Sequence, residues 1–474
     1  MRSTYLPSSV ESILLSFAPC FTVPSFENFV ALVCGWIVCR GRHTVSRAIL
    51  GSRALGLGRR HHSVVYRFLS RARWVVDDVC RVLFDLLLPF LPCDIQAAID
   101  DTLSHRSGPQ VFGAGMHHDA CASTYGGSGG RRVSFAFGHN WVVLSIWVPL
   151  PWNPARGFSV PLLFRLYRPK RRCPKEVYRK KTELALEMLQ TLCSWLPQGR
   201  TLLLAGDGEY ACKTLLRQLP AGVEFTGPMS MKAALYDPPP ARRRGRGRPR
   251  SKGRRLPSPA QRLKAKASRW TRLTLTLYGK EVTLDIQTWA CLWYTVRGVQ
   301  LVRVVLTRDP KGRFDPRAFF CTHPDREPAE ILLRYSHRWP LELTFRTAKQ
   351  VMGIEEPRNG WWRRPHGERR PWHKAGPQAH GERGRHAVER TAPLLFITYG
   401  VVFAWYLRHG SPARDVARAR RLRPWDRQKS EPSFDDMLGA LRHALWHKRI
   451  SEYPSLRAVR ANNRALLPLL EAAA

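Results

Sequence analysis

The sequence predicts an α/β fold in which a core of alternating strands and helices is interrupted by an inserted β subdomain, preceded by an all-α domain and followed by helices. Strand-like and helix-like segments alternate from about residue 96 to residue 226, the order expected when helices cover a sheet. Apolar residues recur at three- and four-residue spacing near both ends of the chain, as in amphipathic helices. The chain has 474 residues, 44% of them hydrophobic, which is enough for two or three domains with buried cores.

Residues 1–92 are predicted to form the all-α domain. Its apolar residues follow helical spacing at Phe26, Phe29, Val30, Val33 and Ile37. Between the helices, residues 40–47 and 59–67 combine Arg and His with Ser and Thr, side chains that can contact phosphates. We therefore expect this domain to bind DNA, although the same residues would also suit the solvated face of a packing domain.

Residues 93–228 are predicted to form the first part of the core. Runs of β-branched and aromatic residues predict strands at 96–101, 132–149 and 159–167. A helix is expected at 175–195, a buried strand at 201–206, a second helix at 210–219 and a last strand at 223–226. This order is compatible with an RNase-H-like core.

Residues 229–325 are predicted to interrupt the core with a basic linker and an inserted β subdomain. The linker is rich in Pro, Gly and Arg, which keep a chain extended. After it, alternating segments predict antiparallel strands at 271–277, 280–289, 293–296 and 299–307. The core then resumes at 326–357, with a helix predicted over 329–351.

The C-terminal part is predicted to be helical after a basic loop. Residues 358–390 have no periodicity and are dominated by Arg, His, Gly, Pro and Trp, so we predict a loop there. Residues 391–474 return to a helical pattern, with a buried helix at 391–407 and further helices at 434–446 and 457–470.

The charge balance predicts a nucleic-acid partner. Lys and Arg total 77 against 36 Asp and Glu, a net charge of +41 that an extended polyanion would neutralise. A membrane partner is not expected, because no apolar stretch is long and uninterrupted enough to span a bilayer and no leader pattern opens the chain. The 11 Cys include no CxxC pair, which favours free thiols in a reducing cytoplasm over disulfides or structural zinc.

Acidic residues at the ends of predicted strands are the first candidates for chemistry. Asp100 and Asp101 end one predicted strand, Asp207 follows another, and Glu342 lies in the helix predicted over 329–351. Carboxylates are the ligands that Mg²⁺ prefers, and three of them could hold two ions for phosphodiester cleavage. Taken singly, each Asp would also be an ordinary turn residue or helix cap.

One helix face presents Glu342 among cations. Its residues, spaced by 3, 4, 4 and 3, are Tyr335, Arg338, Glu342, Arg346 and Lys349. At about 100° per residue they fall within a sector of roughly 80°. The cations could grip phosphates beside a metal-bound scissile bond, or the face could be an ordinary salt-bridged surface. Pro340 could begin the helix, which would leave Tyr335 and Arg338 on the preceding turn.

At these residues the sequence resembles the DDE transposases of bacterial insertion sequences, in the subgroup with a Tyr-x2-Arg-x3-Glu-x6-Lys signature. Tyr335, Arg338, Glu342 and Lys349 match that spacing at every position. Ile99-Asp-Asp-Thr-Leu resembles the motif of the first aspartate, and Ala205-Gly-Asp-Gly-Glu-Tyr resembles the motif of the second. The resemblance spans roughly residues 28–406.

The resemblance implies that Asp100, Asp207 and Glu342 form a metal-binding catalytic triad that holds two ions, Mg²⁺ or Mn²⁺. The Asp-x-Thr pattern of the family favours Asp100 as the ligand, with Asp101 as the alternative, since neighbouring strand residues point to opposite faces. Tyr335, Arg338 and Lys349 would contact DNA phosphates near the cleaved end.

The function that the resemblance implies is that of a DNA transposase. It would bind the ends of its element, cut the DNA and join the 3′ hydroxyl to target DNA, as a homodimer on DNA in the bacterial cytoplasm, associated with the nucleoid when bound. Two alternatives remain open at this point: a decayed DNA-binding relative, and an RNase-H-like endonuclease that does not join strands.

Three further groups of residues are weaker candidates for a functional site. Arg246, Arg248 and Arg250 could form a minor-groove hook or bind phosphates without specificity. The group His117, His118, Asp119 and Cys121 could bind a transition metal, but no second ligand cluster completes it. Trp361 and Trp362 could stack on an unpaired base or anchor a loop.

Overall fold

The structure is a computed structural model, which describes residues 6–58, 61–106, 111–123, 132–240, 250–265, 269–357 and 381–452. Its centre is one mixed sheet of twelve strands in which five strands form the predicted core. These core strands are β1 (Asp94–His105), β3 (Phe135–Leu150), β4 (Asn153–Tyr167), β5 (Thr201–Gly206) and β6 (Val223–Met229). β1 pairs antiparallel with β3 and parallel with β5, while β4 pairs antiparallel with β3 and β6 parallel with β5.

The inserted segment continues the core sheet. Its strands are β7 (Leu235–Tyr236), β8 (Arg255–Leu256), β9 (Thr271–Leu277), β10 (Lys280–Leu292), β11 (Leu301–Arg308) and β12 (Arg317–Cys321). β12 pairs antiparallel with β6, and β11 and β10 follow it, so hydrogen bonding runs unbroken from β1 into the insert. The strand expected at 293–296 is wrong, because Tyr294–Arg297 forms the short helix α9 that turns the chain between β10 and β11.

The helices beside the sheet differ from the expected boundaries. α6 (Lys181–Trp195) begins later than expected, and the helix expected at 210–219 is reduced to α7 (Lys213–Leu216). The helix expected over 329–351 is two helices, α10 (Pro328–Ser336) and α11 (Trp339–Gln350). α10 ends at the residue four before Pro340, where the proline ring would clash with the helical carbonyl.

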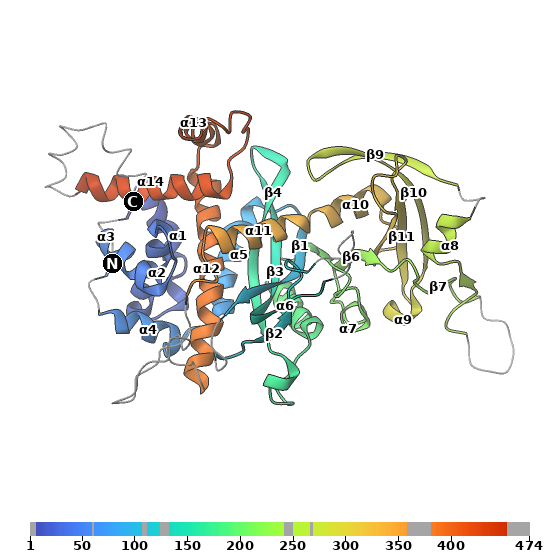
Figure 1. Cartoon of the computed structure of the whole chain (residues 1–474), viewed down its shortest axis with the longest axis horizontal. Coiled ribbons are helices and arrows are strands. Elements are labelled where there is room, and N and C mark those ends of the chain that lie inside the picture. The colour runs from blue at the N-terminus through green and yellow to red at the C-terminus, as the bar shows by residue number, and fades with distance from the viewer. Residues whose placement is uncertain are drawn as a thin grey trace.

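A helical body joins the two ends of the chain (Figure 1). Its N-terminal helices are α1 (Ser8–Leu15), α2 (Val23–Val38), α3 (Val45–Ala54), α4 (His62–Ser70) and α5 (Val76–Leu87). Its C-terminal helices are α12 (Gly381–His409), α13 (Pro412–Leu422) and α14 (Phe434–Glu452). α12 packs against α1, α2, α4, α5 and α14 and also against β4, so it connects the helical body to the sheet.

The prediction of a basic loop over 358–390 is wrong for residues 381–390, which are helical. Residues 381–390 belong to α12, and the buried Arg390 donates to the carbonyls of Leu69 and Trp74. Residues 358–380, with Trp361 and Trp362, lie outside the described residues, as does the helix expected at 457–470. Within the described part of the chain, Gly384–His409 is apolar and long enough to cross a membrane, but 89% of its most apolar window is buried inside the fold. It is therefore a core helix of this structure.

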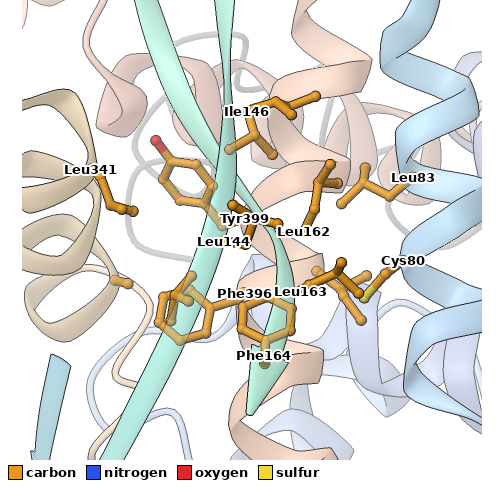
Figure 2. Close-up of a cluster of buried hydrophobic side chains, with 14 of the residues drawn as sticks. Cys80, Leu83, Leu144, Ile146, Leu162, Leu163, Phe164, Leu341, Phe396 and Tyr399 are labelled. Atoms are coloured by element: carbon orange, nitrogen blue, oxygen red, sulfur yellow. The ribbon is translucent and has the colours of Figure 1, made fainter. Parts of the chain in front are cut away.

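One hydrophobic core spans the helical body and the sheet. Figure 2 shows side chains from α5, β3, β4, α11 and α12 meeting in it, among them Leu83, Leu144, Leu163, Leu341 and Phe396. All of these side chains are fully buried. All eleven cysteines are free thiols, as predicted from their spacing.

Candidate active site

Asp100 and Asp101 lie in the middle of β1, not at its end as the sequence suggested. The strand continues to His105 because residues up to that point pair with β3, where His105 faces Gly138. A side chain at Gly138 would collide with the Ser104 carbonyl, so glycine permits this close pairing. The acids therefore lie where β1 is paired with β3, directly after its pairing with β5 ends at Ile99.

The two aspartates face opposite sides of the sheet. The Asp100 carboxylate accepts a hydrogen bond from Arg338 Nη1 at 2.6 Å, on the side covered by α10 and α11. The Asp101 carboxylate accepts one from Lys181 Nζ at 3.0 Å, on the side covered by α6. Only Asp100 shares its side of the sheet with Glu342.

Asp207 lies beside Asp100 at the end of the neighbouring strand. β5 ends at Gly206, which pairs with Ile99 of β1, so the next residues of both strands are Asp207 and Asp100. Parallel neighbours are about 4.8 Å apart. Asp207 Oδ1 accepts hydrogen bonds from the backbone N–H groups of Glu209 (2.9 Å) and Tyr210 (3.3 Å), which fix the turn after β5.

Glu342 reaches the same place from the first turn of α11. Arg338, the residue before this helix, donates Nη1 to Asp100 and Nη2 to Glu342 Oε1, both at 2.6 Å. A single guanidinium thus bridges two acids that are 242 residues apart in sequence, from 342 − 100. The structure thus links Asp100 and Glu342 through Arg338, and Asp207 follows the strand position next to Asp100.

The electrostatics of this cluster appear in the pKa of Asp100, which is raised to about 7. The largest cause is burial, which disfavours the ionised carboxylate; Arg338 lowers the pKa, and the charges of Asp207 and Asp101 raise it again. The Arg338 cation therefore offsets only part of the rise in the pKa of Asp100.

This donor set fits a hard divalent cation. Carboxylate oxygens are the ligands that Mg²⁺ and Mn²⁺ prefer, and the neighbouring carboxylates Asp207 and Asp101 add to the effect of burial in raising the pKa of Asp100. In this structure Arg338 stands between Asp100 and Glu342, and among the described residues no group of three or more His, Cys, Asp or Glu is already arranged around a metal position. Asp100 and Glu342 would have to exchange bonds with Arg338 for bonds with the ion.

The other residues of the signature have different surroundings. Tyr335 lies on α10, packs against Phe319 and sits under the Arg338 guanidinium at 5.7 Å. Arg346 is exposed on α11. Lys349 Nζ donates to the Leu103 carbonyl at 2.6 Å, so it holds α11 against β1 in this structure. Because α10 and α11 are separate helices, the single cationic face predicted from the spacing is confined to Glu342, Arg346 and Lys349.

Two groups beside the site were missed by sequence reasoning. Lys181 bridges Asp101 and Glu209 Oε2 (3.2 Å), tying the turn after Asp207 to β1 from the far side of the sheet. His337 stacks on Trp147 with ring centroids 4.2 Å apart, and burial lowers its pKa to about 4, so it is neutral. The Gly-Glu-Tyr sequence after Asp207 was the available signal for Glu209; nothing local marks Lys181 or Trp147.

The weaker candidates that the structure describes are His117, His118, Asp119, Cys121 and Arg250. His117 is buried, while Asp119 accepts hydrogen bonds from His105 and from the backbone N–H groups of Cys121 and Ala122. In the part of the chain that the structure describes, they form no metal-binding group with His118. Arg250 is exposed, and Arg246 and Arg248 lie outside the described residues.

Comparison with known proteins gives a family for the chain. The family described as DDE superfamily endonuclease matches residues 16–290, more than half of the chain, including Asp100 and Asp207 and ending before Glu342. No curated protein matches. Among solved structures, the chain is similar to a cryo-EM structure of the piggyBac transposase synaptic complex with hairpin DNA, at 12% identity and a TM-score of 0.35 over 97% of this chain and 81% of that one.

Proposed function

Because the chain belongs to the DDE superfamily endonuclease family, we propose that it is a metal-dependent DNA transposase of the type found in bacterial insertion sequences. The observation that carries this proposal is the Arg338 bridge between Asp100 and Glu342, with Asp207 at the chain position that follows β5 beside Asp100. The first two fall inside the family match, and the third follows from the Tyr335-x2-Arg338-x3-Glu342-x6-Lys349 spacing.

The core topology supports an RNase-H-like assignment. The strands run β4-β3-β1-β5-β6, with β3 antiparallel to its neighbours β4 and β1, and with β1, β5 and β6 parallel. Acids on β1 and directly after β5 thus occupy neighbouring central strands, where a helix from the other side of the insert can bring a third acid to them.

Each residue has a role in the proposed reaction. Asp100, Asp207 and Glu342 would hold the divalent ions, which activate the attacking hydroxyl and stabilise the leaving oxygen in phosphodiester chemistry. Arg338, released from Asp100 and Glu342, would pair with a DNA phosphate, and the exposed Arg346 would contact the backbone beside it. Tyr335 stacks under Arg338 and orients it.

The proposal includes cleavage at the element ends, joining of the 3′ hydroxyl to target DNA, a homodimer that pairs two ends, and a cytoplasmic location at the nucleoid. These parts come from the resemblance of the signature residues. An endonuclease that does not join strands would use the same three acids, so the reaction products separate the two functions.

The test is a cleavage assay on DNA that carries the flanking ends of the native gene, with Mg²⁺, Mn²⁺ or EDTA. Wild type should cut and join the ends with metal only, and Glu342→Gln should lose at least about 100-fold in rate while it still binds DNA. Glu176→Gln, a change at an exposed glutamate away from the site, is the matched control. Cleavage that survives in Glu342→Gln would refute the mechanism; cut ends without joined DNA would indicate the endonuclease.

A further inference from the structure

Helix α13 carries a row of arginines over a groove in the helical body. Arg414, Arg418 and Arg421 are spaced by four and three residues and therefore lie on one face of this helix. A groove of about 550 Å³ between α13 and α14 is lined by these three arginines. Ala440 and His443 of α14 form its other wall.

The positive charge of this groove is compensated poorly. Among the described residues, no carboxylate pairs with Arg418 or Arg421. Asp415 also lines the groove, but its Oδ2 already accepts from Tyr406 Oη at 2.9 Å and from the Ser411 N–H at 3.2 Å, and Arg414 lies 3.8 Å from its other oxygen.

On the opposite side of α13, Arg420 and the C-cap residue Arg423 have bonded partners within the protein. There, Arg423 pairs with Asp436 at 2.5 Å and lies 3.6 Å from Asp435, while Arg420 donates to the Lys429 carbonyl. These bonds fix the loop between α13 and α14. The arginines of the helix thus divide into a structural set with partners and a groove set that faces open space.

The pKa of His443 reflects the positive charge around the groove. This pKa is lowered, first by burial and then by the charges of Arg418, His447 and Arg414, with Asp415 opposing them. The ring is therefore neutral near pH 7, and the groove keeps a positive potential from fixed arginines that do not titrate.

We propose that this groove, lined by Arg414, Arg418 and Arg421, binds the phosphodiester backbone of duplex DNA. The identity of the partner rests on the proposed function. Seven residues of helix place the first and last arginine about 10 Å apart, a length that suits successive phosphates along a strand rather than one small anion. Each guanidinium can contact a phosphate through two N–H groups.

A lipid surface fits this helix less well. A helix that binds a membrane needs its apolar side free to enter the lipid, but the apolar side of α13 carries Val416 and Ala419, which are buried in the protein. Leu422 at the C-terminal end of the helix is exposed, but it forms no continuous apolar side with the buried Val416 and Ala419.

The groove is held in a fixed position relative to the sheet. Glu431, in the loop between α13 and α14, accepts hydrogen bonds from Trp152 Nε1 at 2.9 Å and Asn153 Nδ2 at 2.8 Å, at the turn between β3 and β4. Figure 1 shows α13 at the edge of the molecule toward which this turn projects. DNA bound at the catalytic face could therefore extend onto α13 without a change in the fold.

The experiment measures DNA binding as a function of salt, in EDTA so that no cleavage occurs. Fluorescence anisotropy with a labelled duplex gives the slope of log Kd against log [NaCl] for wild type and for Arg418→Gln/Arg421→Gln. Each phosphate contact contributes about 0.9 to this slope. The double variant should lower the slope by about 2 and weaken binding roughly tenfold at ~0.1 M NaCl.

Two control variants make the result specific. Arg171→Gln/Arg179→Gln removes the same charge from exposed arginines between β4 and α6 and should keep the wild-type slope. Arg418→Lys/Arg421→Lys keeps the charge in the groove and should also keep the slope, which excludes a folding defect caused by changing these positions.

Several outcomes would overturn the proposal: an unchanged slope in the groove variant, an equal loss in the Arg171/Arg179 control, or loss of binding to phosphatidylserine vesicles with DNA binding intact. Failure of the proposed function is a separate observation. If the groove determines the slope but wild type cuts no DNA with metal, the proposed function fails and the groove assignment stands.

Discussion

Asp100 and Asp101 show how much one step along a strand changes the surroundings of a side chain. The sequence could state that the two point to opposite faces, and the Asp-x-Thr resemblance favoured Asp100. It could not show which face holds the helix with Glu342, because that depends on how residues far apart pack. The structure places Asp100 with Arg338 and Asp101 with Lys181. The metal role of Asp100 stays a prediction.

The raised pKa of Asp100 predicts that the metal-free protein loses stability as the pH rises. An acid whose folded pKa is about 7, against 3.8 for the ordinary group, stabilises the fold at low pH and loses this contribution as pH rises through 7. Asp100→Asn stays neutral, so its stability relative to wild type should increase by on the order of 2 kcal/mol between pH 5 and pH 8.

Urea unfolding in EDTA at both pH values measures this difference. Mg²⁺ should reverse it for wild type at pH 8, since the ion binds the ionised carboxylate. A difference between the two proteins that does not change with pH would contradict the assignment of this pKa to Asp100.

Lys181 is predicted to hold the turn that carries Asp207. Its Nζ lies between Asp101 and Glu209, and Lys181→Met would leave the partly buried Asp101 carboxylate facing the more exposed Glu209 carboxylate. We expect a loss of about 2 kcal/mol in the free energy of unfolding. Adding Asp101→Asn should recover much of it, and the double-mutant cycle gives the coupling energy. Simple additivity of the two changes would mean that the pair does not interact.

At the scale of elements, local signals located most segments but not their ends. Pro340 explains why α10 ends at Ser336, and the sequence contained that information. The length of β1 depends instead on its pairing with β3, and β12 was not expected at all, because its place is set by pairing with β6 across about 90 residues. The start of α12 was missed because Arg-rich, Gly-rich sequence hides a helix that tertiary contacts stabilise.

Close packing of α2 on α3 gives a prediction about two glycines. A Cβ at Gly35 in α2 would lie 2.0 Å from the Ala48 carbonyl oxygen of α3, whereas one at Gly439 in α14 would meet no atom within 4 Å. Gly35→Ala should therefore destabilise the protein by about 2 kcal/mol or more. Gly439→Ala should stabilise it by about 0.5–1 kcal/mol, because alanine favours a helix.

Thermal unfolding of the two variants measures both effects. The substitution is chemically the same in each, so the difference in sign isolates the contact between α2 and α3. Equal effects at the two positions would show that helix propensity alone decides the outcome.

At the scale of the whole molecule, one sheet joins segments that the sequence assigned to separate units. It runs through residues assigned to the core and residues assigned to the insert. The N-terminal helices share a core with α12 and α14, for example through Arg442 of α14, which donates to the Ile37 and Cys39 carbonyls. Composition and periodicity carry no information on which distant segments share a core.

This shared core predicts that the chain can be assembled from two pieces. Fragments 1–357 and 381–474, produced together, should copurify as a folded one-to-one complex, because α12 buries Leu394, Phe396 and Phe403 against the helical body and β4. Fragment 1–357 alone should aggregate, since the matching apolar faces of α5 and β4 would be exposed to water. Size-exclusion chromatography and circular dichroism measure both results. A soluble, folded 1–357 fragment that does not bind 381–474 would show that the sheet folds without α12 and that the helical body is a separate domain.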